Sequence, residues 1–230
     1  MKINTVIFDF DGTIADTNKI IIDSWQAVYR AYTGKEGDED YILSTFGEPL
    51  YYSMEKAFPD HDVEETVAIY RGYQKDIYRK EIKLFPGMEE LIRGLKEKNY
   101  KTGIVTSRLK QPTYEGLEVF GIEDQIDEIV TVEDTDKHKP DPEPARICLE
   151  RLNSKPEESI MIGDSYFDMG CGKNAGMKTV MVGWSQAADS VLESVALKGV
   201  SPEERIAFTP DYIIKTSDQV WDIIAEINRE

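Results

Sequence analysis

The sequence predicts an α/β fold with a parallel sheet, helices on both faces of the sheet, and an inserted helical domain. The first observation is an alternation of short apolar runs with segments of helical periodicity, which is typical of parallel sheets buried on both faces. The second is segment 16–82, which holds helical patterns and no strand-like run. The third is the length, since 230 residues can bury one sizeable core and support a smaller domain beside it.

The expected strands are short runs rich in apolar and β-branched residues. The first, TVIFDF, runs into two aspartates, and KTGIVTS, EIVTVED, SIMIGDS and KTVMVGW repeat the apolar pattern further along the chain. DYIIK is expected to form a last short strand. In residue numbers, we expect strands at 5–10, 101–107, 128–134, 159–165, 178–184 and 211–215.

Helical segments separate these strands. In the first of them, Met88, Leu91, Ile92 and Leu95 recur at the spacing of one helix face. Two others end at a glycine, which commonly terminates helices. Because a helix between two strands brings the second strand parallel to the first, the series predicts one parallel sheet. We expect these helices at 87–100, 112–121, 141–153, 167–177 and 217–228.

Segment 16–82 breaks the alternation and is expected to be wholly helical. Ile21 and Trp25 lie on the apolar stripe of its first helix, and two further helical patterns follow. These helices could simply cover one face of the sheet, but the segment is long for a crossover connection, which favours a separate domain. The expected organisation is an α/β core of residues 1–15 and 83–230 with a helical domain of residues 16–82.

The composition narrows the classes of partner. The formal net charge is −17 and the pI is near 4.6, so the chain lacks the basic surface that nucleic acids or an anionic membrane would need. It has no apolar run of about 18 residues, and its start, MKINTVIFDFDGT, has no signal-peptide pattern. Cys148 and Cys171 lie in separate helical segments, so we expect no disulfide and a cytoplasmic location.

Polar residues gather after the ends of four predicted strands. Because the carboxyl ends of parallel strands meet at one edge, where ligands bind in such sheets, we expect these side chains to converge. Clustered carboxylates repel one another unless a cation joins them, and Mg²⁺ prefers oxygen ligands and phosphate. Two histidines and no cysteine pair give little support to a zinc site. The converging groups are Asp9 with Asp11, Thr106 with Ser107, His138 with Lys139, and Asp164 with Asp168.

The spacing of the first pair suggests a division of labour. Asp9 and Asp11 are two positions apart, so in an extended chain both project toward the same side. One carboxylate can attack phosphorus, while the other gives a proton to the leaving group and later activates water. Gly12 allows a tight turn and a close approach of the backbone to phosphate. Thr13 can satisfy turn amides or fix a carboxylate.

Four motifs in this order resemble the signature motifs of the haloacid dehalogenase superfamily. They are DFDGTIADT, VTSR, KPDPEP and GDSYFDM, and each follows a predicted strand. The resemblance covers nearly the whole chain. It implies a Rossmann-like core and identifies segment 16–82 as a mobile cap, which closes over the core and selects the substrate.

The resemblance also implies roles for the acidic residues. Asp9 would be the nucleophile that forms an aspartyl-phosphate, and Asp11 the general acid and base. The metal ligands for Mg²⁺ would be Asp9, the backbone carbonyl of Asp11, and Asp164. Asp168 would support the water shell of the metal.

The same resemblance implies a phosphate-binding set. Thr106 and Ser107 would hold phosphate oxygens, with Gly12 beside them. Lys139 would pair with both the phosphate and Asp9. The substrate would thus be a small phosphorylated metabolite, while the oligomeric state, monomer or homodimer, stays open.

The reaction expected is phosphoryl transfer, because true dehalogenases are similar but lack the second aspartate, here Asp11. The DGTIADT and FPG motifs are most similar to phosphoglycolate phosphatases, and HKPDPEP followed by KTVMVGW is similar to small cytoplasmic pyrophosphatases. We therefore expect a Mg²⁺-dependent phosphatase, with phosphoglycolate the first substrate and pyrophosphate the second. The alternatives are a sugar-phosphate mutase similar to β-phosphoglucomutase and a non-catalytic binding protein. Segment 185–208, predicted helical with a turn at 199–202, is longer than either branch requires.

Some of these residues have a purely structural alternative. Thr106 and Ser107 could cap the N-terminus of the following helix, which also suits anion binding. Arg108 could bind substrate anions or could be an exposed surface arginine. The stretch FGEPL at 46–50 could touch the substrate or merely connect two helices. His138 is next to Lys139, but the expected mechanism does not require it.

Overall fold

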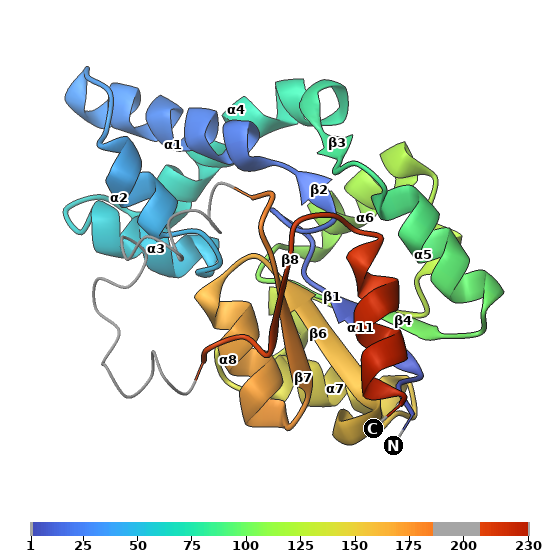
Figure 1. The fold of residues 1–230 in the computed structure, drawn as a ribbon. Coiled ribbons are helices and arrows are strands. Elements are labelled where there is room, and N and C mark those ends of the chain that lie inside the picture. The colour runs from blue at the N-terminus through green and yellow to red at the C-terminus, as the bar shows by residue number, and fades with distance from the viewer. Residues whose placement is uncertain (1, 186–207, 230) are drawn as a thin grey trace.

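The computed structural model describes residues 2–185 and 208–229, and its centre is a parallel sheet of six strands (Figure 1). The strand order is β5-β4-β1-β6-β7-β8, and every neighbouring pair is parallel. The predicted α/β class and all six predicted strands are therefore confirmed. The strands are β1 (Thr5–Phe8), β4 (Lys101–Val105), β5 (Glu128–Val130), β6 (Ser159–Gly163), β7 (Lys178–Val182) and β8 (Tyr212–Ile214).

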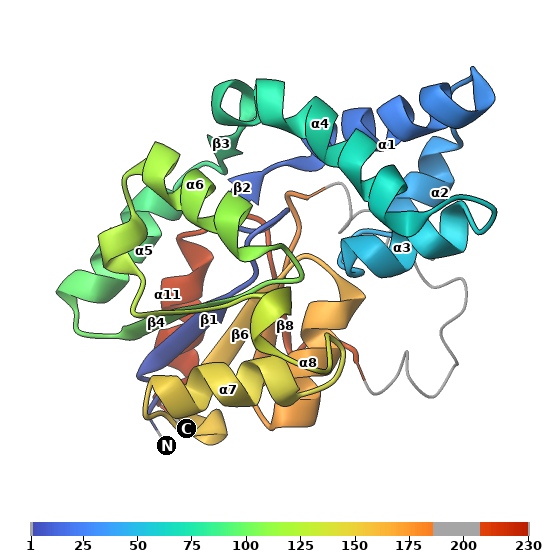
Figure 2. The ribbon, with the colours of Figure 1, turned by 180° about the vertical axis from the view of Figure 1, so that it is seen from behind.

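Helices cover both faces of this sheet. Successive residues of each strand point to opposite sides, so one strand contributes side chains to the core beneath each layer of helices. Val6 and Phe8 of β1 belong to the hydrophobic cluster beneath one layer of helices, and Ile7 belongs to the cluster beneath the other. The two layers are seen from opposite sides in Figures 1 and 2. The first layer holds α5 (Met88–Glu97), α6 (Lys110–Phe120) and α11 (Gln219–Ile227), and the second holds α7 (Glu143–Arg151) and α8 (Tyr166–Ala175).

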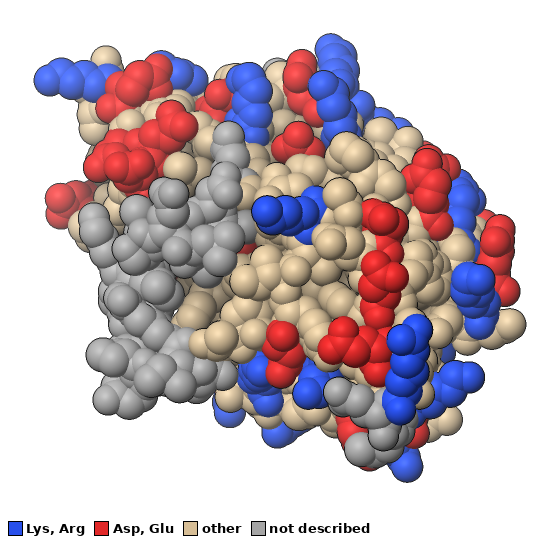
Figure 3. Space-filling view, viewed as in Figure 1, with Lys and Arg blue, Asp and Glu red and all other residues tan. Residues whose placement is uncertain are grey.

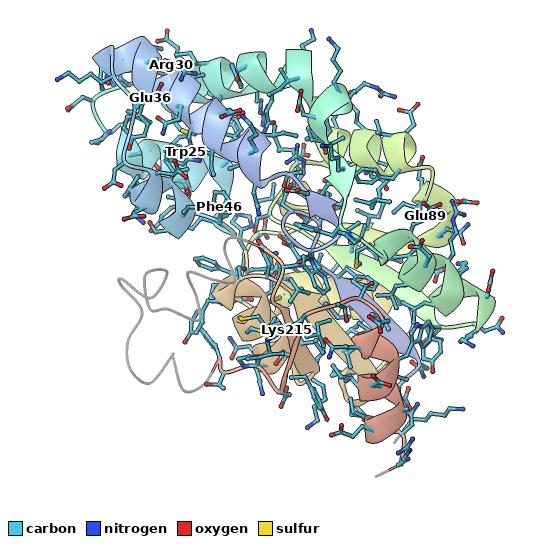
Figure 4. The ribbon with its side chains drawn as sticks, turned by 45° about the horizontal axis from the view of Figure 1, so that its top comes forward. Trp25, Arg30, Glu36, Phe46, Glu89 and Lys215 are labelled. Carbon is cyan, nitrogen blue, oxygen red and sulfur yellow. The ribbon has the colours of Figure 1, made fainter. Side chains whose placement is uncertain are left out.

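Residues 18–81 form four helices beside the carboxyl edge of the sheet, which we call the helical module (Figure 1). Trp25 and Val28 are buried in a hydrophobic cluster of the module's own, and Figure 4 shows Trp25 inside it, while Arg30 and Glu36 pair at its outer end. The chain enters through β2 (Ala15–Asp16) and leaves through β3 (Lys83–Leu84), which pair antiparallel. The helices are α1 (Asn18–Thr33), α2 (Glu39–Ser44), α3 (Leu50–Ala57) and α4 (Val63–Glu81).

The structure departs from the predicted elements at β5 and α2, and the short strands β2 and β3 were not predicted either. Strand β5 ends at Val130, two residues before the 3₁₀ helix η2 (Val132–Asp134), because the side chain of Asp134 accepts hydrogen bonds from the backbone N–H and hydroxyl of Thr131. Helix α2 was not predicted, and it begins where Asp38 accepts a hydrogen bond from the backbone of Asp40. The helical prediction for 186–207 lies outside the described residues. Two other 3₁₀ helices are η1 (Glu123–Gln125) and η3 (Pro156–Glu158).

The described surface carries both signs of charge. On the face in Figure 3, lysine and arginine side chains are interspersed with aspartate and glutamate over the part of the chain that the structure describes. The described helices include none that is long and apolar enough to cross a bilayer. Cys148 and Cys171 are both free and buried.

Candidate active site

The carboxyl ends of the sheet bring residues from four distant parts of the chain into one cleft. Asp9 directly follows β1, Thr106 follows β4 and Asp164 follows β6, while Lys139 comes from the loop before α7. All four line a cleft of about 960 Å³ between the sheet edge and the helical module. In Figure 4, Phe46 marks the side of the module that faces the sheet, and it lines the same cleft.

Lys139 is the cation at the bottom of this cleft. Its side chain is 2% exposed, and its ammonium group lies 2.9 Å from Asp9 Oδ1 and 2.6 Å from Asp168 Oδ1. Burial disfavours the charged ammonium, yet the carboxylates of Asp168 and Asp9 more than offset this and hold the pKa of Lys139 above its ordinary value. The side chain is therefore a permanent positive charge beside Asp9.

Asp168 orients this lysine from the first turn of α8. Its Oδ2 accepts hydrogen bonds from the backbone N–H and the hydroxyl of Ser165, at 3.0 and 2.5 Å, in a capping box that starts the helix. Its other oxygen binds Lys139. Because both oxygens already have partners in the protein, Asp168 fixes the position of the lysine.

Asp164 is held at the edge by Ser185, which is far away in sequence. Its Oδ2 accepts a hydrogen bond of 2.6 Å from the hydroxyl of Ser185, and that hydroxyl also accepts a 3.4 Å bond from Asn18 at the start of α1. Gly12 packs on the same carboxylate, with φ at 74°, and a Cβ there would lie 1.9 Å from Asp164 Oδ2. Only glycine therefore fits at position 12. Ser185 belongs to no motif, so the sequence did not predict its contact with Asp164.

Burial and mutual repulsion disfavour the ionised forms of the clustered carboxyl groups. Burial raises the pKa of Asp9 to about 7, and although Lys139 opposes this, the carboxylates of Asp168 and Asp11 add to it. Burial, together with the charges of Asp9 and Asp168, raises the pKa of Asp164 well above its usual range. The site therefore favours an additional positive charge.

A divalent cation fits this donor set. Carboxylate oxygens of Asp9, Asp164 and Asp168 lie within 4.8 Å of one another, and hard cations such as Mg²⁺ prefer such oxygens. Among the described residues, none donates a hydrogen bond to Asp9 Oδ2 or Asp164 Oδ1. Asp9 and Asp164 are therefore the side chains that could hold the ion. The carboxylate of Asp11 is engaged elsewhere.

Asp11 forms an ion pair with Arg108, which is buried and is therefore not the exposed surface arginine that the sequence left as an alternative. Its carboxylate accepts hydrogen bonds of 3.0 and 3.3 Å from Nη1 of Arg108 and one of 2.6 Å from the hydroxyl of Thr17. The Arg108 side chain is 7% exposed. Burial disfavours its charge, but Asp11, Tyr78 and Tyr70 raise the pKa of the guanidinium further above its ordinary value, in that order.

The hydroxyl residues after β4 do not cap the next helix, because α6 begins only at Lys110, after Leu109. Thr106 lines the cleft, and its Oγ1 accepts a hydrogen bond from the backbone of Arg108. The hydroxyl of Ser107 instead donates to the backbone carbonyl of Gly47 in the helical module. Thus both residues line the cleft, Thr106 with its predicted partners and Ser107 with its hydroxyl bonded to the module.

The motif residues and the loop at 46–50 also meet at this cleft. Phe46, Gly47, Glu48, Pro49 and Leu50 all line it, so this stretch is more than a connection between helices. His138 lines it too, and its Nδ1 is buried without a hydrogen-bond partner among the described residues.

The sequence of this chain matches a known family over most of its length. The family model described as haloacid dehalogenase-like hydrolase matches residues 6–182. Pyrophosphatase PpaX from Halalkalibacterium halodurans is 35% identical over 225 residues, which cover 97% of this chain and 98% of the relative. Pyrophosphatase PpaX from Bacillus cereus is 33% identical over 229 residues, covering 100% of both chains.

Solved structures agree with this match. A haloacid dehalogenase-like hydrolase from Bacteroides fragilis has a TM-score of 0.78 at 26% identity, over 95% of this chain and 100% of that chain. A second such hydrolase, from Streptococcus pneumoniae, has a TM-score of 0.77 at 23% identity, over 96% and 98% of the two chains, and supports the fold alone. The family match, the relatives and the geometry of the four motifs together show that the chain belongs to the haloacid dehalogenase-like hydrolases.

Proposed function

We propose that this protein is a Mg²⁺-dependent phosphatase that acts on small phosphorylated metabolites through an aspartyl-phosphate at Asp9. The observation that carries the proposal is the environment of Asp9. One of its oxygens is fixed by Lys139, while its other oxygen receives no hydrogen bond from the described residues. A carboxylate held in this way, in a cleft with a second carboxylate two residues on, is suited to attack phosphorus.

The groups around Asp9 would neutralise the substrate. Asp9, Asp164 and the backbone carbonyl of Asp11 would hold Mg²⁺, which when bound neutralises charge on the phosphoryl oxygens. Lys139 would bind a phosphoryl oxygen from the other side, and Thr106 would donate a hydrogen bond to another. These charges would offset the repulsion between an anionic substrate and an acidic cleft.

The reaction would proceed in two displacements. In the first, a carboxylate oxygen of Asp9 forms a bond to phosphorus, the bond from phosphorus to the leaving oxygen breaks, and Asp11 protonates that oxygen. In the second, water attacks phosphorus, its proton passes to Asp11, and the bond to Asp9 breaks to release phosphate. The helical module would act as the cap, with residues 16–82 closing on the core formed by 1–15 and 83–230.

Pyrophosphate is the substrate that the comparisons favour. The two curated relatives described above, which match this chain over nearly its whole length, are named pyrophosphatases. A phosphoglycolate phosphatase structure from Haemophilus somnus is 18% identical, and at this identity the likeness speaks only for the fold. We therefore place pyrophosphate before phosphoglycolate, which the motifs alone put first.

The experiment that tests this proposal measures phosphate release from a panel of substrates. The panel holds pyrophosphate, phosphoglycolate, a hexose phosphate and p-nitrophenyl phosphate, each with Mg²⁺ and with EDTA. We expect Mg²⁺-dependent release with the highest kcat/KM on pyrophosphate. Interconversion of hexose phosphates with little free phosphate would instead indicate a mutase, and no turnover of any substrate would favour a binding protein.

A further inference from the structure

Arg108 is a buried cation whose hydrogen-bonding capacity is only partly used. It lies in the loop after β4 and lines the cleft that Asp9 and Asp11 share. Nη1 donates to both oxygens of Asp11, but Nε and Nη2 are buried and have no acceptor among the described residues. Buried polar groups in folded proteins nearly always have partners, so these two nitrogens indicate a missing acceptor.

The surroundings hold the guanidinium in place without supplying another negative charge. Its central carbon lies 4.6 Å from the centroid of the Tyr78 ring, a cation–π distance. The Tyr78 hydroxyl donates a 2.8 Å hydrogen bond to the carbonyl oxygen of Pro112. Burial raises the pKa of Tyr70 and Tyr78, so both stay neutral. Among the described residues, Asp11 is therefore the one carboxylate in an ion pair with Arg108.

The position of Asp11 limits the distance between the Arg108 guanidinium and the leaving oxygen. In the proposed reaction the carboxyl group of Asp11 exchanges a proton with the leaving oxygen, which requires a separation of about 3 Å. Nη1 of Arg108 lies 3.0 Å from the same carboxyl group. The guanidinium therefore lies within roughly 6 Å of the leaving oxygen, which is close enough to reach charged oxygens on a compact leaving group.

We propose that Arg108 binds a second anionic group of the substrate, the group carried by the leaving oxygen, and so selects diphosphates over monoesters of neutral alcohols. This inference rests on the proposed phosphatase activity and names its substrate class. Guanidinium groups bind phosphate through paired N–H donors, and Nε with Nη2 offer such a pair along one edge. Tyr78, whose ring lies against the face of the guanidinium and not along this edge, belongs to α4.

The test compares two substrates in three proteins. Pyrophosphate has an anionic leaving group, and p-nitrophenyl phosphate lacks the second phosphoryl group. We expect Arg108→Gln to lower kcat/KM for pyrophosphate by about 10- to 100-fold more than for p-nitrophenyl phosphate, because the lost contact with Asp11 affects both substrates but only pyrophosphate also loses charge-assisted hydrogen bonds. Arg108→Lys should recover part of the loss, because it keeps the charge but not the paired donors.

Arg71 supplies a matched control within the same cleft. It lies over the ring of Tyr51, at 5.6 Å, and forms no ion pair with Asp11. Arg71→Gln removes one positive charge from the cleft and should affect both substrates alike. Equal losses on both substrates in Arg108→Gln would mean that Arg108 only positions Asp11 and would overturn the proposal. A selective loss for pyrophosphate of the same size in Arg71→Gln would overturn it as well.

A binding measurement separates this inference from the proposed function. Methylenediphosphonate, a diphosphate analogue that resists hydrolysis, is titrated calorimetrically with Mg²⁺ into the wild type and Arg108→Gln. We expect its Kd to rise by about 10- to 100-fold, with little change for inorganic phosphate. Unchanged affinity would refute the anion site whatever the turnover. A wild-type protein that binds the analogue through Arg108 but cleaves nothing would refute only the proposed function.

Discussion

The hydroxyl group of Ser107 donates a hydrogen bond of 2.7 Å to the backbone carbonyl of Gly47, and this bond ties the sheet edge to the helical module. Gly47 has φ at 88°, and a Cβ there would come within 2.9 Å of Ser165 Oγ. The loop between α2 and α3 therefore lies against the ends of both β4 and β6. Because these strand ends also carry Thr106 and Asp164, the position of the module and the shape of the cleft are linked.

Removal of this bond should weaken the contact between the helical module and the sheet edge. We expect Ser107→Ala to raise KM for small substrates by about 2- to 10-fold, because a neutral hydrogen bond contributes about 0.5–1.5 kcal/mol, and to change kcat less. Steady-state kinetics measure both constants. Ser154→Ala is the matched control, since its hydroxyl bonds Thr5 at the opposite end of the sheet. A loss of kcat with KM unchanged would contradict this and would place Ser107 on the reacting phosphoryl group.

Asp9→Asn should remove the nucleophile while leaving a similar shape. We expect phosphate release to fall by about 10⁴-fold or more, because no other group at that position can form the covalent intermediate. Mass spectrometry after rapid acid quenching should find a phosphoryl adduct on the peptide that contains Asp9 in the wild type. Asp16→Asn, a nearby exposed aspartate in β2, is the control. Turnover at the normal rate in Asp9→Asn would show that another group attacks phosphorus.

The arrangement of the fold was predictable because it follows from local patterns. Apolar runs located the six strands, and helical spacing located the helices between them, since both patterns reflect burial on the two faces of one sheet. The end of β5 was not predictable from its sequence. EIVTVED has the composition of a strand throughout, but Asp134 binds back to Thr131 and turns the chain at that point. Such a side-chain bond competes with the strand in a way that periodicity does not record.

The candidate site was predictable where a motif carried the chemistry. Asp9, Lys139 and Asp164 converge because parallel strands end at one edge, which topology alone dictates. Arg108 was undecided because its burial depends on Tyr78, a residue of the helical module with no sequence signal of contact. Ser185 was not predicted because it lies 21 residues beyond Asp164 and belongs to no motif.

Asp211 joins Lys173 and Thr179 at the end of the sheet opposite the cleft. Its carboxylate lies 2.8 Å from the Lys173 ammonium and accepts hydrogen bonds of 2.8 and 3.0 Å from the backbone N–H and hydroxyl of Thr179. Partial burial raises its pKa, but the Lys173 and Thr179 bonds outweigh this and hold it below the usual value. We expect Asp211→Asn to lower the free energy of unfolding by about 1–3 kcal/mol at pH 7.

The pH dependence of this loss has a definite sign. Because the folded pKa of Asp211 is lowered, the stabilisation is fully present above the unfolded pKa of about 3.9 and is lost as pH falls through the folded value. Urea unfolding at several pH values should therefore show the gap between wild type and Asp211→Asn shrinking below pH 4. A gap that is constant down to the acid transition would mean that the ionised carboxylate is not the stabilising group.

Ser185 should act on the metal through Asp164. Its hydroxyl donates the 2.6 Å hydrogen bond that fixes Asp164 Oδ2, and Asp164 is one of the three carboxylates of the acidic cluster. Residues that orient a metal ligand commonly change metal affinity by about 10- to 100-fold when they are mutated. We expect Ser185→Ala to raise the Kd for Mg²⁺ within this range, because an unfixed carboxylate must be ordered when the ion binds.

Calorimetric titration of Mg²⁺ into the two proteins measures this effect without any substrate. Ser24→Ala is the matched control, because Ser24 is also buried and its hydroxyl bonds only the Ile20 carbonyl within α1. That variant should bind Mg²⁺ like the wild type. Equal Mg²⁺ affinity in Ser185→Ala and the wild type would show that Asp164 is fixed by the strand end alone. A loss of the same size in Ser24→Ala would trace the effect to general destabilisation of the fold.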